Sequence, residues 1–90
     1  RGARGAPDWV IEVLSPATAS HDQVRKRDLY ERHGVVEYWL VHPADRLVTV
    51  YRLQDGAYGK PHVQELSGRL RPGVPDGIEV DLDVAAAVLG

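Results

Sequence analysis

The sequence predicts an α/β fold in which a strand, a helix and a parallel second strand form a right-handed crossover, followed by an antiparallel hairpin. Two short runs rich in β-branched and aromatic residues, 8–14 and 35–41, are typical of strands. Between them, a capping box and a closing Gly predict a helix over 21–33. Ninety residues with 43% apolar content support one core, so we expect a single domain over 1–90, with 1–6 as a loop or tail.

The first strand is closed by Ser15-Pro16, because proline lacks the amide that a sheet ladder needs. Its apolar residues occupy both faces, Trp9, Ile11 and Val13 on one and Val10 and Leu14 on the other. This pattern predicts a strand that is covered on both sides. The helix that follows has only a thin apolar stripe of Val24, Leu29 and Tyr30, so we expect most of its surface to be solvated.

The second strand should be central and buried around Trp39, and it continues into the hairpin. Turn residues at 43–46 lead to an alternating third strand over 47–53 that pairs with it antiparallel. The remainder of the chain predicts weaker elements. These are a fourth strand over 60–66, a loop over 67–77, a short strand over 78–82 and a terminal helix over 83–89.

The composition excludes several classes of function. The sequence contains no Cys, which rules out disulfides and thiolate metal sites, and its four His lack the spacing of zinc ligands. Apolar runs are shorter than the roughly 18 residues of a membrane span, and no secretory signal is evident, so we expect a cytoplasmic protein. A formal charge of −2 excludes a uniformly basic nucleic-acid-binding surface, although a local basic strip is compatible with it.

Glu12 is the most informative residue, because it lies in the middle of a strand with apolar neighbours on both faces. Burying an unpaired carboxylate is costly, so Glu12 should be paired, hydrogen-bonded or bound to a cation. One interpretation is structural, with Glu12 on a half-solvated face or paired with a nearby Arg. The other is chemical, because carboxylate oxygens are the ligands that Mg²⁺ prefers.

Lys26 is the natural companion of Glu12, since it lies one and a half turns into the following helix. Asp22 and Tyr30, four residues before and after Lys26, share its helix face. In isolation, a lysine at this position is more often a solvated helix cation. Asp8 cannot share one ion with Glu12, because four strand residues separate the two by about 13 Å.

A series of motifs stands in order along the chain: Pro7 to Pro16 (PDWVIEVLSP), Lys26 to Tyr30, Gly34-Val35, Glu37 to Val41, and Pro43. A weaker continuation includes Val48, Tyr51-Arg52, Leu66 to Gly68, and Val80 to Leu82. In this order and spacing the motifs resemble the central signature of the Uma2 family, restriction-endonuclease-like proteins of the PD-(D/E)XK superfamily. The resemblance covers nearly all of the chain.

The resemblance implies a restriction-endonuclease-like mixed sheet and hydrolysis of nucleic-acid phosphodiester bonds with Mg²⁺ or Mn²⁺, with DNA as the partner. Glu12 matches the acidic residue of the (D/E)XK half, and the carbonyl of Val13 matches the backbone oxygen that the superfamily places on the metal. Leu14 stands where the superfamily usually has Lys, and Lys26 matches the helix position that carries the Lys in this family. The implied catalytic residues are therefore Glu12 and Lys26, and the implied metal ligands are Glu12 and Val13.

The family domain is longer than this chain, and its N-terminal half would carry another metal-binding Asp, on a strand before Pro7, and an acidic residue on the first helix. Two hypotheses therefore stay open. The chain is part of a metal-dependent nuclease, or it is a non-catalytic remnant or interaction module on the same fold. This chain would leave sheet edges that the other half of the family domain would cover, and such edges would favour a homo-oligomer.

Overall fold

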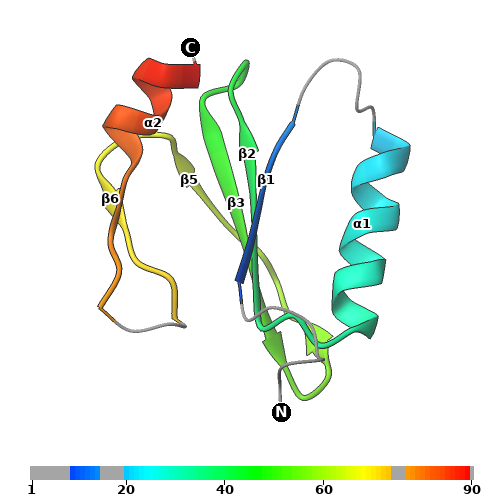
Figure 1. Cartoon of the computed structure of the whole chain (residues 1–90). Coiled ribbons are helices and arrows are strands. Elements are labelled where there is room, and N and C mark those ends of the chain that lie inside the picture. Colours follow the sequence, from blue (N-terminus) through cyan, green and yellow to red (C-terminus); the bar gives the residue numbers. More distant parts are fainter. Residues whose placement is uncertain (1–8, 15–19, 74–76, 90) are drawn as a thin grey trace.

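The computed structural model describes residues 9–14, 20–73 and 77–89, and it shows a mixed sheet of five strands between two helical layers (Figure 1). The strands of this sheet are β1 (Trp9–Val13), β2 (Glu37–His42), β3 (Leu47–Gln54), β4 (Ala57–Tyr58) and β5 (His62–Glu65). Helix α1 (Ser20–Arg32) lies on one side of the sheet. On the other side lie β6 (Arg69–Leu70), β7 (Val80–Asp81) and α2 (Leu82–Leu89).

The strand pairing confirms the predicted topology. Strand β1 pairs parallel with β2, so that Glu12 lies opposite Leu40, and β2 pairs antiparallel with β3. Strand β5 continues the sheet antiparallel to β3, as expected of the fourth strand, while β4 extends the far end of β3. A parallel pair linked by a helix and followed by a hairpin is therefore the framework that positions the site.

Several boundaries differ from the prediction. Helix α1 begins at Ser20 and ends at Arg32, and Gly34 follows it with the positive φ of 78° that a helix-closing glycine adopts. The segment expected to be loop contains β6, whose two residues pair with β7. Such short strands carry too little periodicity to be recognised in sequence. The side chains of the predicted capping box, the tail 1–6 and Asp8 lie outside the described residues.

The main core lies between the sheet and α2. It consists of buried residues from β2, β3, α2 and the β5–β6 connection: Trp39, Val41, Val48, Val50, Leu66, Leu82 and Ala86. Trp39 is 1% exposed, as predicted for a central strand, and the ring of Trp9 meets it edge-on with the centroids 5.0 Å apart. Within the described residues, neither helix is long and apolar enough to cross a membrane.

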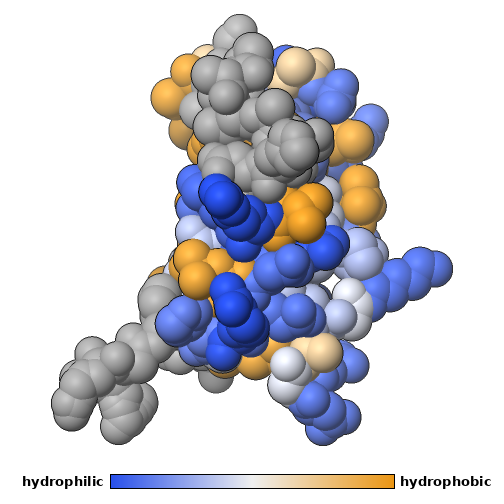
Figure 2. All heavy atoms as spheres, turned by 90° about the vertical axis from the view of Figure 1, so that its right-hand side faces the viewer, coloured by the Kyte–Doolittle hydropathy of each residue, from blue (hydrophilic) through white to orange (hydrophobic). Residues whose placement is uncertain are grey.

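Strand β1 corrects one expectation, because it is not covered on both sides. Ile11 is 43% exposed and Val13 is 46% exposed on the face toward α2. The α2 layer packs over β2 and β3, and β1 forms the edge of the described sheet, so no described element covers Ile11 and Val13. Helix α1 is largely solvated as expected: Val24 is 50% and Leu29 41% exposed, and hydrophilic and hydrophobic residues mix on this side of the molecule (Figure 2).

Candidate functional site

Glu12 lies on the face of the sheet that α1 covers. Side chains alternate along a strand, so Glu12 shares its face with Val10 and with their β2 partners, Leu40 and Tyr38. The Glu12 side chain is 27% exposed, which leaves it between the protein interior and the solvent. The carboxylate is therefore accessible to a ligand while its position is fixed by the strand.

Two side chains of α1 contact the Glu12 carboxylate. The Lys26 ammonium donates to Oε1 over 3.2 Å, and the Tyr30 hydroxyl donates to Oε2 over 2.5 Å. Lys26 and Tyr30 are four residues apart and project from the same side of the helix. The structure thus brings together Glu12 and Lys26, as the sequence predicted, and it identifies the pairing that offsets the burial of Glu12.

Tyr30 is the site residue that sequence reasoning did not assign. Burial, together with its hydrogen bond to Glu12, raises the pKa of Tyr30 to about 12. Tyr30 therefore stays protonated near neutral pH and acts as a permanent donor to the carboxylate. The sequence did contain a signal for Tyr30, because its four-residue spacing from Lys26 places the two side chains on the same helix face.

Contacts at the C-terminal end of α1 hold the helix against the sheet. The Tyr58 amide donates to Oε2 of Glu31 over 2.7 Å, and the Tyr58 hydroxyl donates to the carbonyl of Val35 over 2.9 Å. The ring of Tyr30 meets the ring of Tyr38 edge-on, with the centroids 5.0 Å apart. The contacts of Glu31 and Tyr30 hold the last turns of α1 against the sheet, and from there Tyr30 reaches Glu12.

The carbonyl of Val13 points to the outer edge of β1. The amide of Leu14 donates to the carbonyl of Val41 on β2 over 2.8 Å. A trans peptide group directs its C=O and N–H to opposite sides, so the Val13 carbonyl in the same peptide group points away from β2. In the described sheet no strand pairs with this edge, so the Val13 oxygen accepts no hydrogen bond from a described strand. Its role on a metal stays a prediction.

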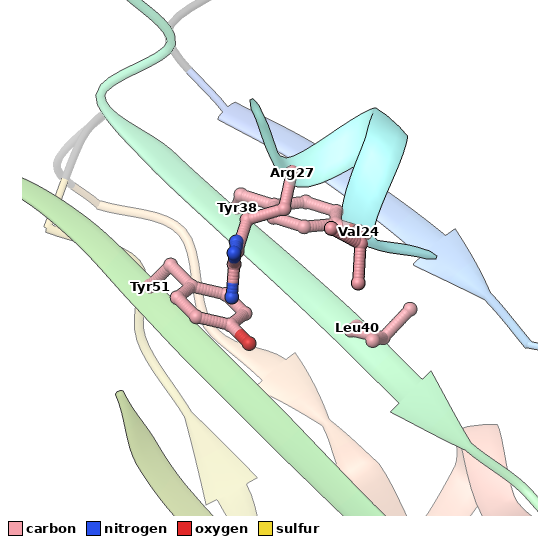
Figure 3. Close-up of a pocket in the computed structure, with 5 residues that line it drawn as sticks. All are labelled: Val24, Arg27, Tyr38, Leu40 and Tyr51. Atoms are coloured by element: carbon pink, nitrogen blue, oxygen red, sulfur yellow. The ribbon is translucent and has the colours of Figure 1, made fainter. Parts of the chain in front are cut away.

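A small cavity lies between α1 and the sheet (Figure 3). Its volume is about 70 Å³, and it is lined by Val24, Arg27, Tyr38, Leu40 and Tyr51. The rings of Tyr38 and Tyr51 stack with a centroid distance of 5.6 Å. A side-chain hydrogen bond with Tyr51 raises the pKa of Arg27. The pKa of Tyr38 is also raised, mainly by burial and to a smaller extent by the negative charge of Glu12.

Glu37, a second carboxylate from the sequence motifs, serves the structure on the opposite face. It is 1% exposed and accepts hydrogen bonds from Trp39 Nε1 over 2.6 Å and from the Gly73 amide over 2.7 Å. The guanidinium of Arg52 pairs with it over 3.2 Å. Three donors satisfy this buried charge, and the contacts tie the segment at Gly73 to the sheet.

The described residues do not make a complete metal site. Within 9–14, 20–73 and 77–89, no three His, Asp or Glu side chains lie close enough together to hold one ion. Mg²⁺ requires about six oxygen ligands in near-octahedral geometry. The site offers the carboxylate of Glu12 and the carbonyl of Val13, so further ligands would have to come from residues beyond those described, from water or from a substrate.

Comparison with known proteins identifies relatives of this chain. Residues 1–85 match the Uma2 family, described as "putative restriction endonuclease". The structure is similar to the crystal structure of "a putative nuclease belonging to DUF820" from Anabaena variabilis, with a TM-score of 0.75 and 26% sequence identity. The match covers 96% of this chain and 47% of that nuclease, so the chain spans about half of its solved relative. A search of curated proteins found no match. From the family match over nearly its whole length, the chain belongs to the Uma2 family.

Proposed function

We propose that this chain forms part of the active site of a metal-dependent nuclease that hydrolyses phosphodiester bonds in DNA. The observation that carries the proposal is the contact between Lys26 Nζ and Glu12 Oε1, 3.2 Å apart, made by residues from different elements. A carboxylate and an ammonium that are both partly exposed can each reach a substrate. The side chain of Glu12 is 27% exposed and that of Lys26 is 39% exposed, so both meet that requirement.

Each residue has a distinct role in the proposal. Glu12 and the carbonyl of Val13 supply two oxygens to a divalent cation, which would polarise the phosphate and activate water. Lys26 places a positive charge beside the carboxylate, where it can orient the attacking water or stabilise charge that develops on the phosphoryl oxygens. Tyr30 holds the carboxylate in one orientation through its hydrogen bond to Oε2.

The experiment compares variants of the full-length gene product in DNA cleavage. Glu12→Gln and Lys26→Ala should each reduce the initial rate on plasmid and single-stranded DNA at least about a hundredfold with Mg²⁺ or Mn²⁺, the scale for losing one electrostatic or acid-base group. Lys60→Ala is the matched control, because Lys60 is an exposed lysine on the β4–β5 connection. Asp8→Asn should leave cleavage within a few-fold of the parent rate, since four residues of extended chain would separate Asp8 from Glu12 by about 13 Å.

The outcomes separate catalysis from stability. Melting should barely change for Lys26→Ala, because a partly exposed ion pair contributes little to stability. Full activity of a folded Lys26→Ala variant would remove Lys26 from the mechanism. An inactive but folded Asp8→Asn variant would show that the acidic residue of the site was wrongly assigned.

A second candidate function is an interaction module without catalysis. It is favoured by the absence of any three-residue ligand cluster among the described residues. The outer edge of β1 has no partner in the described sheet, and such an edge can pair with a second copy. Absence of cleavage by the full-length protein with either metal, together with dimerisation in analytical ultracentrifugation, would support this module.

A further inference from the structure

We propose that His42 donates a hydrogen bond from Nδ1 to a phosphate oxygen of a DNA strand that is bound at Glu12. The proposal rests on the proposed nuclease function, but it concerns substrate binding and is tested without cleavage. His42 is the last residue of β2, and its side chain is partly buried. An imidazole in this setting has a position fixed by the fold and an edge that a ligand can reach.

His42 lies on the sheet face that carries Glu12. Side chains alternate along a strand, so His42 shares its face with Leu40 and Tyr38 of β2. Figure 3 shows both of these residues beside Val24 of α1. Glu12 is the strand partner of Leu40 and contacts α1, so it lies on this face as well. Two residues along the strand and one strand spacing across the sheet separate the Cα atoms of His42 and Glu12 by about 8 Å.

The spacing of the two residues suits a strand of DNA. Such a strand carries one phosphate per nucleotide, and successive phosphates lie several ångströms apart. A strand with one phosphate at Glu12 therefore places a neighbouring phosphate near His42, about 8 Å away along the sheet. A residue that holds this neighbour positions the strand relative to the carboxylate without touching the bond that is cleaved.

The ring of His42 is held in place by Thr49. Nε2 of His42 lies 3.0 Å from Oγ1 of Thr49 on the neighbouring strand β3. Thr49 is 9% exposed, so its hydroxyl has little access to water. When this hydroxyl donates to Nε2, the neutral imidazole carries its proton on Nδ1. The contact therefore fixes the orientation of the ring and leaves a donor on its other nitrogen.

Nδ1 of His42 is the donor that stays available for a substrate. The contact with Thr49 is the one hydrogen bond that the His42 ring makes within the described residues. In this part of the chain, the polar side-chain atoms that are both enclosed and unpaired are Trp9 Nε1 and the Tyr38 hydroxyl. Nδ1 is not one of them, so it has no protein partner and is not sealed from the surface.

The charges around His42 are compatible with a phosphate. The Glu12 carboxylate is paired with the Lys26 ammonium over 3.2 Å, which balances its charge. In the row of His42 across the sheet, Leu47 is the strand partner of His42 and Glu65 is the partner of Leu47. Strand β3 therefore separates the imidazole from this second carboxylate.

The test measures binding of a short single-stranded oligodeoxynucleotide to the full-length protein by fluorescence anisotropy, in chelator and below the melting transition of every variant. His42→Gln keeps a polar atom in the place of Nε2, whereas His42→Asn keeps an amide nitrogen in the place of Nδ1. We expect His42→Gln to weaken binding at least about tenfold and His42→Asn to weaken it less than about threefold. Absence of binding by the parent protein would overturn the proposal, because the contact involves no cation.

The melting temperatures should follow the opposite order. His42→Gln retains the contact with Thr49 and should melt close to the parent protein. His42→Asn leaves the Thr49 hydroxyl buried without its partner and should melt at a lower temperature. A purely structural His42 would make binding and melting decrease together. A larger loss of binding in His42→Asn than in His42→Gln would therefore overturn the proposal, as would equal losses in both or no loss in either.

His62→Gln is the matched control. Nε2 of His62 also lies 3.0 Å from a neighbouring side chain, at Gln64 Oε1, but His62 is the strand partner of Val50 and lies on the face toward α2. Its substitution should leave binding unchanged, and a loss equal to that of His42→Gln would overturn the proposal in favour of a general effect of histidine.

An abasic oligonucleotide of the same length serves as the second probe, because it keeps the phosphates and lacks the bases. The loss of binding in His42→Gln should be the same on both probes. A loss confined to the probe with bases would overturn the assignment to a phosphate.

Cleavage assays separate this proposal from the nuclease proposal. If Glu12→Gln abolishes cleavage while His42→Gln binds like the parent protein, the nuclease assignment stands and the phosphate contact fails. If Glu12→Gln cleaves at the parent rate while the His42 variants bind as expected, the phosphate contact stands and the catalytic assignment of Glu12 fails.

Discussion

Replacing Tyr30 by Phe removes one hydroxyl from the site and leaves the ring that packs on Tyr38. The lost contact is the donation to Glu12 Oε2 over 2.5 Å, while the contact of Lys26 with Oε1 stays. The substitution therefore tests how much the orientation of the Glu12 carboxylate contributes to stability and activity, because packing and charge change little. Glu12 would keep its ion pair but gain freedom to rotate.

The structure sets the expected loss of stability and of cleavage activity in the Tyr30→Phe variant. Hydrogen bonds to charged groups contribute about 1.5 to 3 kcal/mol, and a carboxylate 27% exposed can recruit water, so we expect about 1.5 kcal/mol. In a domain of this size that corresponds to a decrease in melting temperature of about 6 to 12 °C. Loss of a group that orients a metal-binding carboxylate reduces metal affinity or activity about 10- to 100-fold, and we expect the cleavage rate to decrease by that factor.

Tyr58→Phe is the matched control for Tyr30→Phe. The Tyr58 hydroxyl donates to the carbonyl of Val35 over 2.9 Å, a neutral acceptor far along the chain from Glu12. Its loss should cost about 1 kcal/mol and leave the cleavage rate per folded molecule unchanged. Urea unfolding gives the stabilities, and initial rates over a range of Mg²⁺ concentrations give the activities. Equal rate losses in the two variants at full folding would refute an orienting role for Tyr30.

Three further predictions follow from the fold and the site. Trp39→Ala should destabilise the protein by about 3 to 5 kcal/mol in urea unfolding, because Trp39 is 1% exposed and donates to Glu37; unchanged melting would contradict its central place in the core. This chain alone should bind Mg²⁺ with a dissociation constant in the millimolar range or weaker, since Glu12 is the one carboxylate that the described residues place at the site; micromolar binding in calorimetry would mean that the ligand set is complete. Stability should decrease as pH rises from 10 toward 12, because the folded protein raises the pKa of Tyr30 and Tyr58 to about 12 while the unfolded chain releases these protons near 10. Urea midpoints that stay constant over this pH range would contradict that linkage.

Local patterns in the sequence determined the framework of the fold. The two apolar runs, the capped helix between them and the hairpin turn were sufficient to predict the parallel β1–β2 pair and the antiparallel β2–β3 pair. The burial of Trp39 followed from its place in the second run. The sequence also identified Glu12 as a carboxylate that needs a partner, because its neighbours on the strand are apolar.

The tertiary structure decided which side chains meet. The contact of Tyr30 with Glu12 spans 18 residues and depends on how α1 crosses the sheet, which no local pattern encodes. The exposure of Ile11 and Val13 depends on the position of β1 at the edge of the described sheet, although their residue types predict burial. Likewise, the hydroxyl of Tyr38 is buried without a hydrogen-bond partner among the described residues, which depends on how the interior packs. Periodicity reports which face of an element is apolar, whereas coverage of that face and pairing of a charge depend on contacts between residues distant in sequence.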